Sequence, residues 1–572
     1  MALGAVSEQA LLWRLMAQNM VQAAVRALRG GSVMRFGSLR HTPSRLLIAP
    51  QDLRTTDATN AADIYAGRFL FSGHLVETGG ESPFEIPAPS VEWARALHGF
   101  SWLRHLRAAE TAMAQKNARA LVEDWIKACG RGDPVGWRQE VIARRILSWM
   151  AQSPLLLQGC EADFYRKFMR SLGKQVRYLR RTAGEAPDGV PRLTVAMAVA
   201  CASVSIEGQE RHIRKALKRL DMELQRQILP DGGHVSRHPG AVLDILVDLL
   251  PIRQALVMQG QSASPAMMEA IDRMMPIIRF FRHGDGSFAH FNGMGSTPGD
   301  VVATVLAYDD ARGAPSPSAP YSGYQRLSAA DSLVIMDAGA PPPIQFSGQA
   351  HAGTLSFEFS SHRNRIVVNC GVSQRDRIEW RAVARSTAAH STASVGETSS
   401  SRFLNNPRYE RYLGTPIVSG PRSVSVERYD DELAERVIAS HDGYAARFHL
   451  IHERDLTLSR DGTVLDGVDR FQKTGEPGEN DHYTLRFHLH PTVKCSMLTS
   501  GQAIILQCPD GEAWEFMAED GAVELEESIY LSDVFGHRRT NQIVIYGRAS
   551  ERPNVTWMFR RVAAAKGRRK SN

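Results

Sequence analysis

A change in hydrophobic period partway along the chain constrains the fold more than any other feature of the sequence. From Val91 to about Tyr308, apolar residues recur at spacings of three and four, and Gly, Pro or Asp interrupts the pattern about every 20 residues. Beyond a segment rich in Pro, Ser and Gly at Ala311–Tyr324 the period becomes two, as in TLSFEFSS at 354–361 and RIVVNCG at 365–371. The pattern predicts about eight to ten helices in antiparallel hairpins, followed by many short antiparallel strands.

The chain has 572 residues, whereas a single hydrophobic core rarely extends beyond about 250–300 residues. We therefore expect two large domains. No tetratricopeptide or ankyrin signature repeats in the helical half, which favours an α/α toroid over a solenoid. The strand half has the length and pattern of an antiparallel β-sandwich. The predicted boundaries are an N-terminal helix and irregular lead-in at 1–90, the α/α toroid at 91–320, the antiparallel β-sandwich at 321–562 and a basic tail at 563–572.

The composition excludes several classes of protein. The six cysteines contain no C-x-x-C pair, so neither a zinc ribbon nor a redox motif is expected. Lys and Arg exceed Asp and Glu by seven, which permits an acidic partner, but no basic run is interleaved with aromatic residues, so we expect no nucleic acid. The basic run at Arg177–Arg181 is interpreted as a solvated helix face. The most apolar internal segment, Ala241–Ile252, contains two aspartates and a proline, so no membrane span is expected.

The loop at Leu229–Gly240, LPDGGHVSRHPG, carries dense polar chemistry between two predicted helices. It combines two glycines with Asp231, His234, Arg237 and His238. Loops on a rigid scaffold often carry binding and catalytic groups. The alternative is a plain helix joint, in which the first proline and the glycines end one helix and the second proline begins the next.

A second polar cluster lies at Phe280–Gly295, in the sequence FFRHGDGSFAHFNGMG. It holds His283, Asp285, His290 and Asn292 among glycines and phenylalanines. The spacing matches no standard metal-binding pattern. We interpret the segment as a polar loop or as the polar lining of a sugar-binding cleft.

A third cluster lies in the strand half. His351 opens one predicted strand, Asn369 ends the next, and His390 follows a loop. Neighbouring strands can bring these side chains together, either as a hydrogen-bonded cluster or as metal ligands. If they converge, they should lie within hydrogen-bond reach, directly or through one water.

These clusters, in this order, resemble the heparinase II/III-like family of polysaccharide lyases. The resemblance implies an α/α toroid joined to an antiparallel β-sandwich, with a sugar-binding cleft between them. It also implies cleavage of uronic-acid-containing polysaccharides by β-elimination, in which a base removes a proton next to the uronate carboxyl and an acid protonates the leaving oxygen. The matching segments are WRQEVIARRILSW at 137–149, LPDGGHVSRHP at 229–239, AHAGTLSFE at 350–358, VVNCG at 367–371, RSTAAHST at 385–392 and RFHLHP at 486–491.

The sandwich residues depart from the family pattern. The family's catalytic histidine corresponds to Gln349, whereas its metal-type histidine is retained as His351. The metal-ligand aspartate corresponds to Asn369 and the third ligand to His390. Some family members hold zinc here, but two histidines and a neutral amide make a poor zinc site. We expect no cofactor, and a hydrogen-bonded cluster in place of zinc.

The toroid residues depart as well. The family's catalytic tyrosine corresponds to Ala241, and its catalytic asparagine to the region of Pro191-Arg192. Three catalytic positions are thus altered together, so whether the chain is an enzyme stays open. The substitutes that we predict are His234, His238 and Tyr324 as catalytic groups, with Asp231, Arg237, Arg192, Gln349, His290 and Asn292 in contact with the substrate.

The leading hypothesis is therefore a carbohydrate-active protein, nominally a lyase, whose partner is an acidic polysaccharide. One alternative is a polysaccharide-binding protein that has lost the catalytic residues. Another is a glycoside hydrolase that uses Asp231 and Asp285 as its carboxylate pair. The N-terminus lacks the basic start of a secretory signal, which favours the cytoplasm, while the family resemblance favours the cell envelope. The sequence leaves the oligomeric state open.

Overall fold

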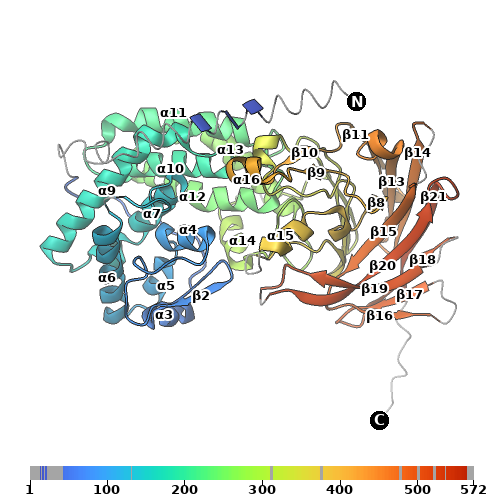
Figure 1. Cartoon of the computed structure of the whole chain (residues 1–572), viewed down its shortest axis with the longest axis horizontal. Helices are drawn as coiled ribbons and strands as arrows, with labels where there is room; N and C mark the ends of the chain where they lie inside the picture. Colours follow the sequence, from blue (N-terminus) through green and yellow to red (C-terminus); the bar gives the residue numbers. More distant parts are fainter. Residues whose placement is uncertain are drawn as a thin grey trace, which may run out of the picture. The chain divides into compact units, whose positions relative to one another are not determined.

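The computed structural model describes residues 13–14, 16–17, 20–21 and 43–562, except 131, 310–312, 374–377, 476–479, 499–502, 520–522 and 535 (Figure 1). The chain divides into two compact units. The helical unit comprises Met1–Ile228, Leu243–Asp272 and Asp300–Asp310. The strand unit comprises Leu229–Val242, Arg273–Gly299 and Ala311–Asn572. The predicted basic tail lies outside the described residues, as does most of the predicted N-terminal helix.

The helices of the first half follow the predicted three-to-four spacing. Helix α4 begins where the Ser90 hydroxyl caps the Trp93 N–H, and α6 begins at a similar Thr111 cap. Between irregular stretches, the lead-in contains a helix and the hairpin β1 (Arg68–Phe71) and β2 (His74–Glu77). The helices are α3 (Ala58–Tyr65), α4 (Val91–Gly99), α5 (Leu103–Ala108), α6 (Ala112–Ala128), α7 (Gln139–Ala151), α8 (Ser153–Leu157), α9 (Ala162–Thr182), α10 (Val190–Ser205), α11 (Glu210–Gln227), α12 (Pro239–Met258), α13 (Pro265–Phe280) and α14 (Gly299–Leu306).

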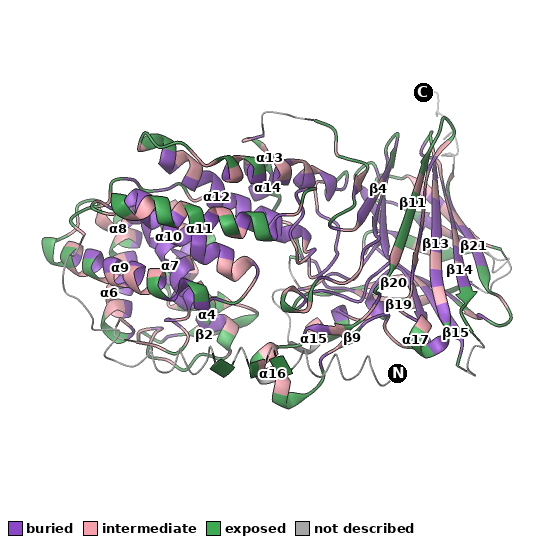
Figure 2. Ribbon diagram, turned by 90° about the horizontal axis from the view of Figure 1, so that it is seen from above, coloured by how far each residue is buried: buried purple, intermediate pink, exposed green. Residues whose placement is uncertain are grey.

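Helix α10 forms the centre of the helical unit. Its sequence is apolar on nearly every side, and every residue from Leu193 to Ser205 is buried. It packs against α7 and α11. By contrast, α9 and α11 bury one face and expose the other, as the alternating colours of α11 in Figure 2 show. A helix that is apolar all round needs neighbours on all sides, and this places α10 inside.

The described residues of the strand half form two large antiparallel sheets (Figure 1) and a small one of β9 (Arg402–Phe403) and β10 (Ile417–Ser419). The first has the order β11 (Val424–Asp430), β12 (Ala434–His441), β13 (Leu450–Ser459), β14 (Val464–Lys473), β21 (Asn554–Val562), β18 (Ala513–Ala518), β17 (Ala503–Gln507) and β16 (Lys494–Met497). The second has the order β19 (Val523–Tyr530), β20 (Arg538–Arg548), β15 (His482–Leu489), β7 (Asn364–Val368), β6 (Phe357–Ser361), β5 (Ser332–Asp337), β4 (Tyr324–Ala329) and β3 (Ser318–Ala319), with β8 (Ala393–Val395) paired to β15. Together they bury one large apolar core.

The fold class predicted from the sequence, a helical toroid followed by an antiparallel β-sandwich, is confirmed. The two alternating segments at 354–361 and 365–371 form the hairpin of β6 and β7, with Ser361 paired to Asn364. The compact units do not coincide with the predicted domain boundaries, because two segments of the helical stretch, 229–242 and 273–299, belong to the same unit as the strands. No described helix is both long and apolar enough to span a bilayer.

Candidate functional site

The loop at 229–240 is fastened to the segment that leads into β4. Gly233 allows a close approach, because a Cβ there would lie 2.6 Å from the Cβ of Ser322. The carboxylate of Asp231 accepts hydrogen bonds from the Ser322 N–H at 2.7 Å, from its hydroxyl at 2.9 Å and from the Gly233 N–H at 3.0 Å. Asp231, which we expected to contact substrate, therefore holds the loop in place.

Arg237 anchors the same loop in the interior of the strand unit. The residue is 7% exposed and has a φ of +60°. Its guanidinium donates to four backbone carbonyl oxygens at 322–323 and 339–340, at distances of 2.7–3.0 Å, and to the carboxylate of Asp337. These bonds use all five guanidinium N–H donors. No donor remains for a ligand, so this geometry does not support the predicted contact of Arg237 with the substrate.

Tyr324 lies at the start of β4 and is fully buried. Its hydroxyl donates to the Arg237 carbonyl oxygen and accepts from Asn292 Nδ2 at 2.8 Å. Burial raises the pKa of the Tyr324 hydroxyl well above its usual range. This burial and these hydrogen bonds do not support the predicted role of Tyr324 as a catalytic group. Asn292, expected to line a sugar cleft, is also engaged, since Nδ2 donates to Asp337 at 3.0 Å and Oδ1 accepts from the His351 N–H at 3.1 Å.

His234 is buried and has its imidazole oriented by the next turn of the loop. The Ser236 N–H donates to His234 Nδ1 at 3.1 Å, so the neutral ring carries its proton on Nε2. Burial and the nearby His238 lower the pKa of His234 to about 3. The lone pair that a general base needs is thus already accepting a hydrogen bond. This geometry does not support the predicted role of His234 as the base.

His238 differs from the other two predicted catalytic residues in being only half-buried. Gly293, with a φ of +91°, makes room for it, because a Cβ at Gly293 would lie 3.2 Å from His238 Cδ2 and 3.3 Å from Gln349 Cβ. The side chain of Gln349 is exposed. Of the predicted site residues, Gln349 is therefore exposed, while His238, Asp231 and Arg192 are half-buried.

His351 and His390 form a directed hydrogen-bonded pair. His390 Nδ1 donates to the Ser386 carbonyl oxygen at 2.7 Å, which leaves a lone pair on Nε2. His351 Nδ1 lies 3.0 Å from that nitrogen and donates to it. Burial, together with His390, holds the pKa of His351 well below its usual range, and burial lowers the pKa of His390 to about 4. The predicted hydrogen-bond contact between the two histidines is present.

The third predicted member, Asn369, is not hydrogen-bonded directly to either histidine and does not complete a zinc site. Its Oδ1 accepts a hydrogen bond from the Ser391 N–H at 2.9 Å, while its buried Nδ2 has no hydrogen-bond partner among the described residues. Tetrahedral zinc would need lone pairs from both imidazoles and, for charge balance, an anionic ligand. Here one imidazole donates to the other and the third group is an engaged amide. The residues do not fit the zinc that some family members hold.

The sequence-based reasoning missed Glu358, a fully buried carboxylate on β6. It accepts from His283 Nε2 at 3.1 Å, from the Asn369 N–H at 2.9 Å and from the Arg365 guanidinium, and it lies 3.7 Å from His290 Nδ1. Burial and the charge of Arg365 lower the pKa of His290 to about 3. His290, expected to line a sugar cleft, therefore faces this carboxylate. The only signal in the sequence was a glutamate between two phenylalanines.

Arg192 belongs to the helical unit, on α10, whereas the other predicted site residues belong to the strand unit. Its Nη1 lies 2.8 Å from the carboxylate of Asp188, and its Nε and Nη2 donate to the Ala186 carbonyl oxygen. The guanidinium is therefore engaged at the beginning of its own helix. This arrangement does not support the predicted contact with substrate.

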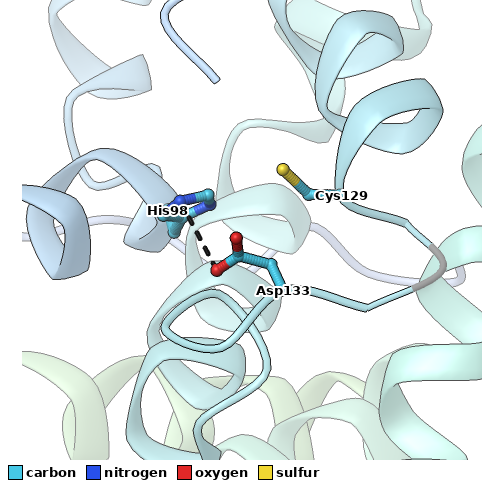
Figure 3. Close-up of side chains that lie close together, drawn as sticks. All are labelled: His98, Cys129 and Asp133. Atoms are coloured by element: carbon cyan, nitrogen blue, oxygen red, sulfur yellow. Dashed lines mark ion pairs between the residues drawn. The ribbon is translucent and has the colours of Figure 1, made fainter. Parts of the chain in front are cut away.

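The described residues contain one group with a metal-like set of donors, His98, Cys129 and Asp133 in the helical unit (Figure 3). The indole of Trp125 donates to His98 Nδ1 at 3.0 Å, so neutral His98 carries its proton on Nε2 and offers no free lone pair. Burial raises the pKa of the Cys129 thiol to about 12. The buried guanidinium of Arg145 lies 3.9 Å from the Trp125 ring. A protonated thiol and a neighbouring cation do not favour a metal ion.

A small polar cavity of about 30 Å³ lies elsewhere in the helical unit. Asp248 lines it from α12 and accepts from Arg144 on α7 at 2.9 and 2.7 Å and from Arg54 at 2.8 Å. Both oxygens of the carboxylate are therefore paired with guanidinium groups. The cavity has the size of one or two water molecules. It lies beside the ion pairs that Asp248 forms with Arg144 and Arg54.

Comparisons with known proteins agree with this architecture. Residues 311–558 match the family described as heparinase II/III-like, C-terminal. FtsZ-localized protein C of Caulobacter vibrioides is 31% identical over 550 residues, which cover 93% of this chain and 94% of that protein. The relationship therefore extends through both halves of the chain.

Solved structures extend the likeness to the fold as a whole. A crystal structure of heparinase III aligns with a TM-score of 0.71 and 16% identity, covering 97% of this chain and 92% of that chain. A mutant of the heparan sulfate lyase HepC from Pedobacter heparinus aligns with a TM-score of 0.61 and 14% identity, covering 97% and 88%. At these identities the likeness concerns the fold alone.

Proposed function

The chain belongs to the heparinase II/III-like family, and from this premise we propose that it binds an acidic polysaccharide without cleaving it. The observation that carries the proposal is the internal engagement of most of the groups that could replace the missing lyase residues, with the half-buried His238 as the exception. A lyase needs a base, an acid and a group that neutralises the uronate carboxylate. The guanidinium groups of Arg237 and Arg192 and the hydroxyl of Tyr324 are each bonded within the protein.

The hydrolase alternative is less favoured by the same reasoning. A hydrolase needs one carboxyl group as acid and another as base or nucleophile. The Asp231 carboxylate accepts three hydrogen bonds from its own loop and from Ser322, and Asp285 accepts from the Ser287 N–H and hydroxyl. These carboxylates support loop geometry rather than proton transfer.

Incubation with uronate-containing polysaccharides tests the proposal. We expect no rise in ultraviolet absorbance and no new reducing ends, while the same polysaccharides retard the protein in affinity electrophoresis. An active lyase of the same fold, treated identically, is the control for substrate quality. A rise in absorbance would mean elimination and would overturn the non-catalytic role. Failure to bind any acidic polysaccharide would overturn the binding role.

We also propose that the protein acts where FtsZ assembles, because its 31% identical relative bears the name FtsZ-localized protein C. A fluorescent fusion expressed with labelled FtsZ tests this. The fluorescence of the fusion should coincide with that of labelled FtsZ in the cell, and this localisation should disappear when FtsZ is depleted. A fusion that stays dispersed, or that keeps its localisation after depletion, would contradict the proposal.

A further inference from the structure

The net positive charge of two helices in the helical unit exceeds the net charge of the whole chain. Helix α9 contains seven Lys and Arg against one Asp, and α11 contains six against three acidic residues. Their surplus is nine, whereas the surplus of the entire chain is seven. The excess charge is therefore concentrated on these two helices and balanced elsewhere.

The C-terminal turns of α9 approach the beginning of α11. Arg180 Nη2 donates to the Gln209 side-chain oxygen at 3.1 Å, one residue before α11 begins. Burial, and then the charges of Arg211 and Arg177, lower the pKa of Arg180. Burial and the surrounding cations likewise lower the pKa of His212. The basic side chains of the two helices are thus close enough to disfavour one another's charge.

Several cations of this cluster lack carboxylate partners. Arg181, Arg211 and Lys215 are exposed, and none of them forms an ion pair with a described residue. The guanidinium of Arg219 on α11 lies near the end of α9, because a Cβ at Gly184 would lie 3.9 Å from it, and we therefore include Arg219 in the cluster. Like charges gathered without counter-ions create a positive potential that attracts an anionic partner. We define Arg181, Arg211, Lys215 and Arg219 as the basic cluster.

We infer that the basic cluster on α9 and α11 binds an acidic polysaccharide. Arg211, Lys215 and Arg219 follow one another at intervals of four residues, which places them on one helix face about 6 Å apart. Such a row matches repeating charges along a linear polymer. A single-stranded nucleic acid would need aromatic side chains for stacking, and a membrane surface would need large apolar ones. Among the described residues of these helices, the one exposed large hydrophobic side chain is Met222.

This inference rests on the proposed function and identifies a surface for it that lies within the helical unit. The probe is a fluorescently labelled heparin oligosaccharide, and the readout is its dissociation constant over a series of salt concentrations. The test variant combines Arg181→Gln, Arg211→Gln, Lys215→Gln and Arg219→Gln. The matched control removes the same charge from exposed positions of the strand unit by Arg363→Gln, Arg408→Gln, Arg422→Gln and Lys494→Gln. Circular dichroism melting confirms that both variants fold.

We expect the test variant to bind heparin at least 10-fold more weakly, and the control variant to bind within 3-fold of the parent. The dependence of log affinity on log salt should become shallower only in the test variant, because fewer counter-ions are released. Equal losses in both variants would show an effect of net charge alone and would overturn the inference. Unchanged binding by the test variant would overturn it as well, while leaving the proposed function intact.

Competition identifies the class of partner. Unlabelled heparin should displace the probe at lower concentration than single-stranded DNA or anionic phospholipid vesicles of equal total charge. Stronger displacement by DNA or vesicles would overturn the assignment to polysaccharide. If the parent protein binds neither heparin nor any uronate-containing polysaccharide, the proposed function fails together with this inference.

Discussion

At the level of single residues, the strand unit holds ion pairs of opposite charge in its interior. Arg237 with Asp337 and Arg365 with Glu358 are both buried. Removing one member of such a pair leaves the other charge buried without a partner, and this costs more free energy than the pair itself contributes. Each of these arginines is therefore expected to matter for folding.

Replacement of Arg237 by alanine tests this directly. We expect Arg237→Ala to lower the free energy of unfolding by about 3–5 kcal/mol, because Asp337 loses its counter-charge and four carbonyl oxygens lose their donors. The exposed Arg363→Ala is the control and should change it by less than about 0.5 kcal/mol. Urea denaturation measures both. Equal midpoints for the two variants would contradict the structural role of Arg237.

Removal of divalent metal provides a second test. The His351–His390 hydrogen bond needs no metal, so extensive treatment with a chelator should leave the melting temperature unchanged. Elemental analysis of the untreated protein should show no stoichiometric zinc. One zinc per chain that is lost in His351→Ala, with a matching fall in melting temperature, would disprove the hydrogen-bonded arrangement.

At the level of elements, Asp248 connects three parts of the helical unit. It projects from α12 and binds Arg144 of α7 and Arg54 of the lead-in. Burial raises the pKa of Asp248, but the two guanidinium groups outweigh burial and hold it below its usual range. This carboxylate therefore stabilises the fold above about pH 4, and the contribution is lost as the pH falls through its lowered pKa.

We expect Asp248→Asn to lower the free energy of unfolding by about 3–5 kcal/mol at neutral pH, because two guanidinium groups lose their counter-charge. Asp272→Asn, at an exposed position of α13 in the same unit, is the matched control and should have a much smaller effect. Hydrogen exchange should also show faster exchange at residues 50–54 in Asp248→Asn only. Equal effects of the two substitutions would contradict the connecting role.

At the level of the whole molecule, buried histidines make stability depend on pH. Burial lowers the pKa of His234, His290 and His488 to about 3 and that of His390 to about 4. In the unfolded chain a histidine has a pKa near 6.5. Between these values the unfolded state binds protons that the folded state does not, so stability falls as the pH falls.

As the pH falls from about 5.5 to 4.5, these four histidines should together lower the free energy of unfolding by about 5 kcal/mol, because each of them binds about one proton when the protein unfolds. Urea denaturation at several pH values measures the slope. His390→Gln should reduce the slope by about one proton, whereas replacement of the exposed His74 should leave the slope unchanged. A slope that corresponds to the uptake of less than one proton on unfolding would contradict the assignment of these histidines as buried and neutral.

The sequence by itself determined the order of the two architectures and many of their turns. Hydrophobic spacing is a local property, and it located the change from helices to strands and the hairpin between β6 and β7. The order of the motifs likewise identified the family. The predicted contact between His351 and His390 is present, but both residues lie in loops that precede β6 and β8 and not on neighbouring strands, so the strand that His351 was expected to open begins later, at Phe357.

Only the tertiary structure decided which polar residues face a ligand and which hold the fold. The guanidinium of Arg237 bonds to groups 85–103 residues away, and Glu358 joins Arg365 and two histidines more than 60 residues before it. No local pattern specifies such partners. A polar side chain in a loop or strand is compatible with solvent or with the interior until distant segments supply its hydrogen bonds, and burial without them is too costly.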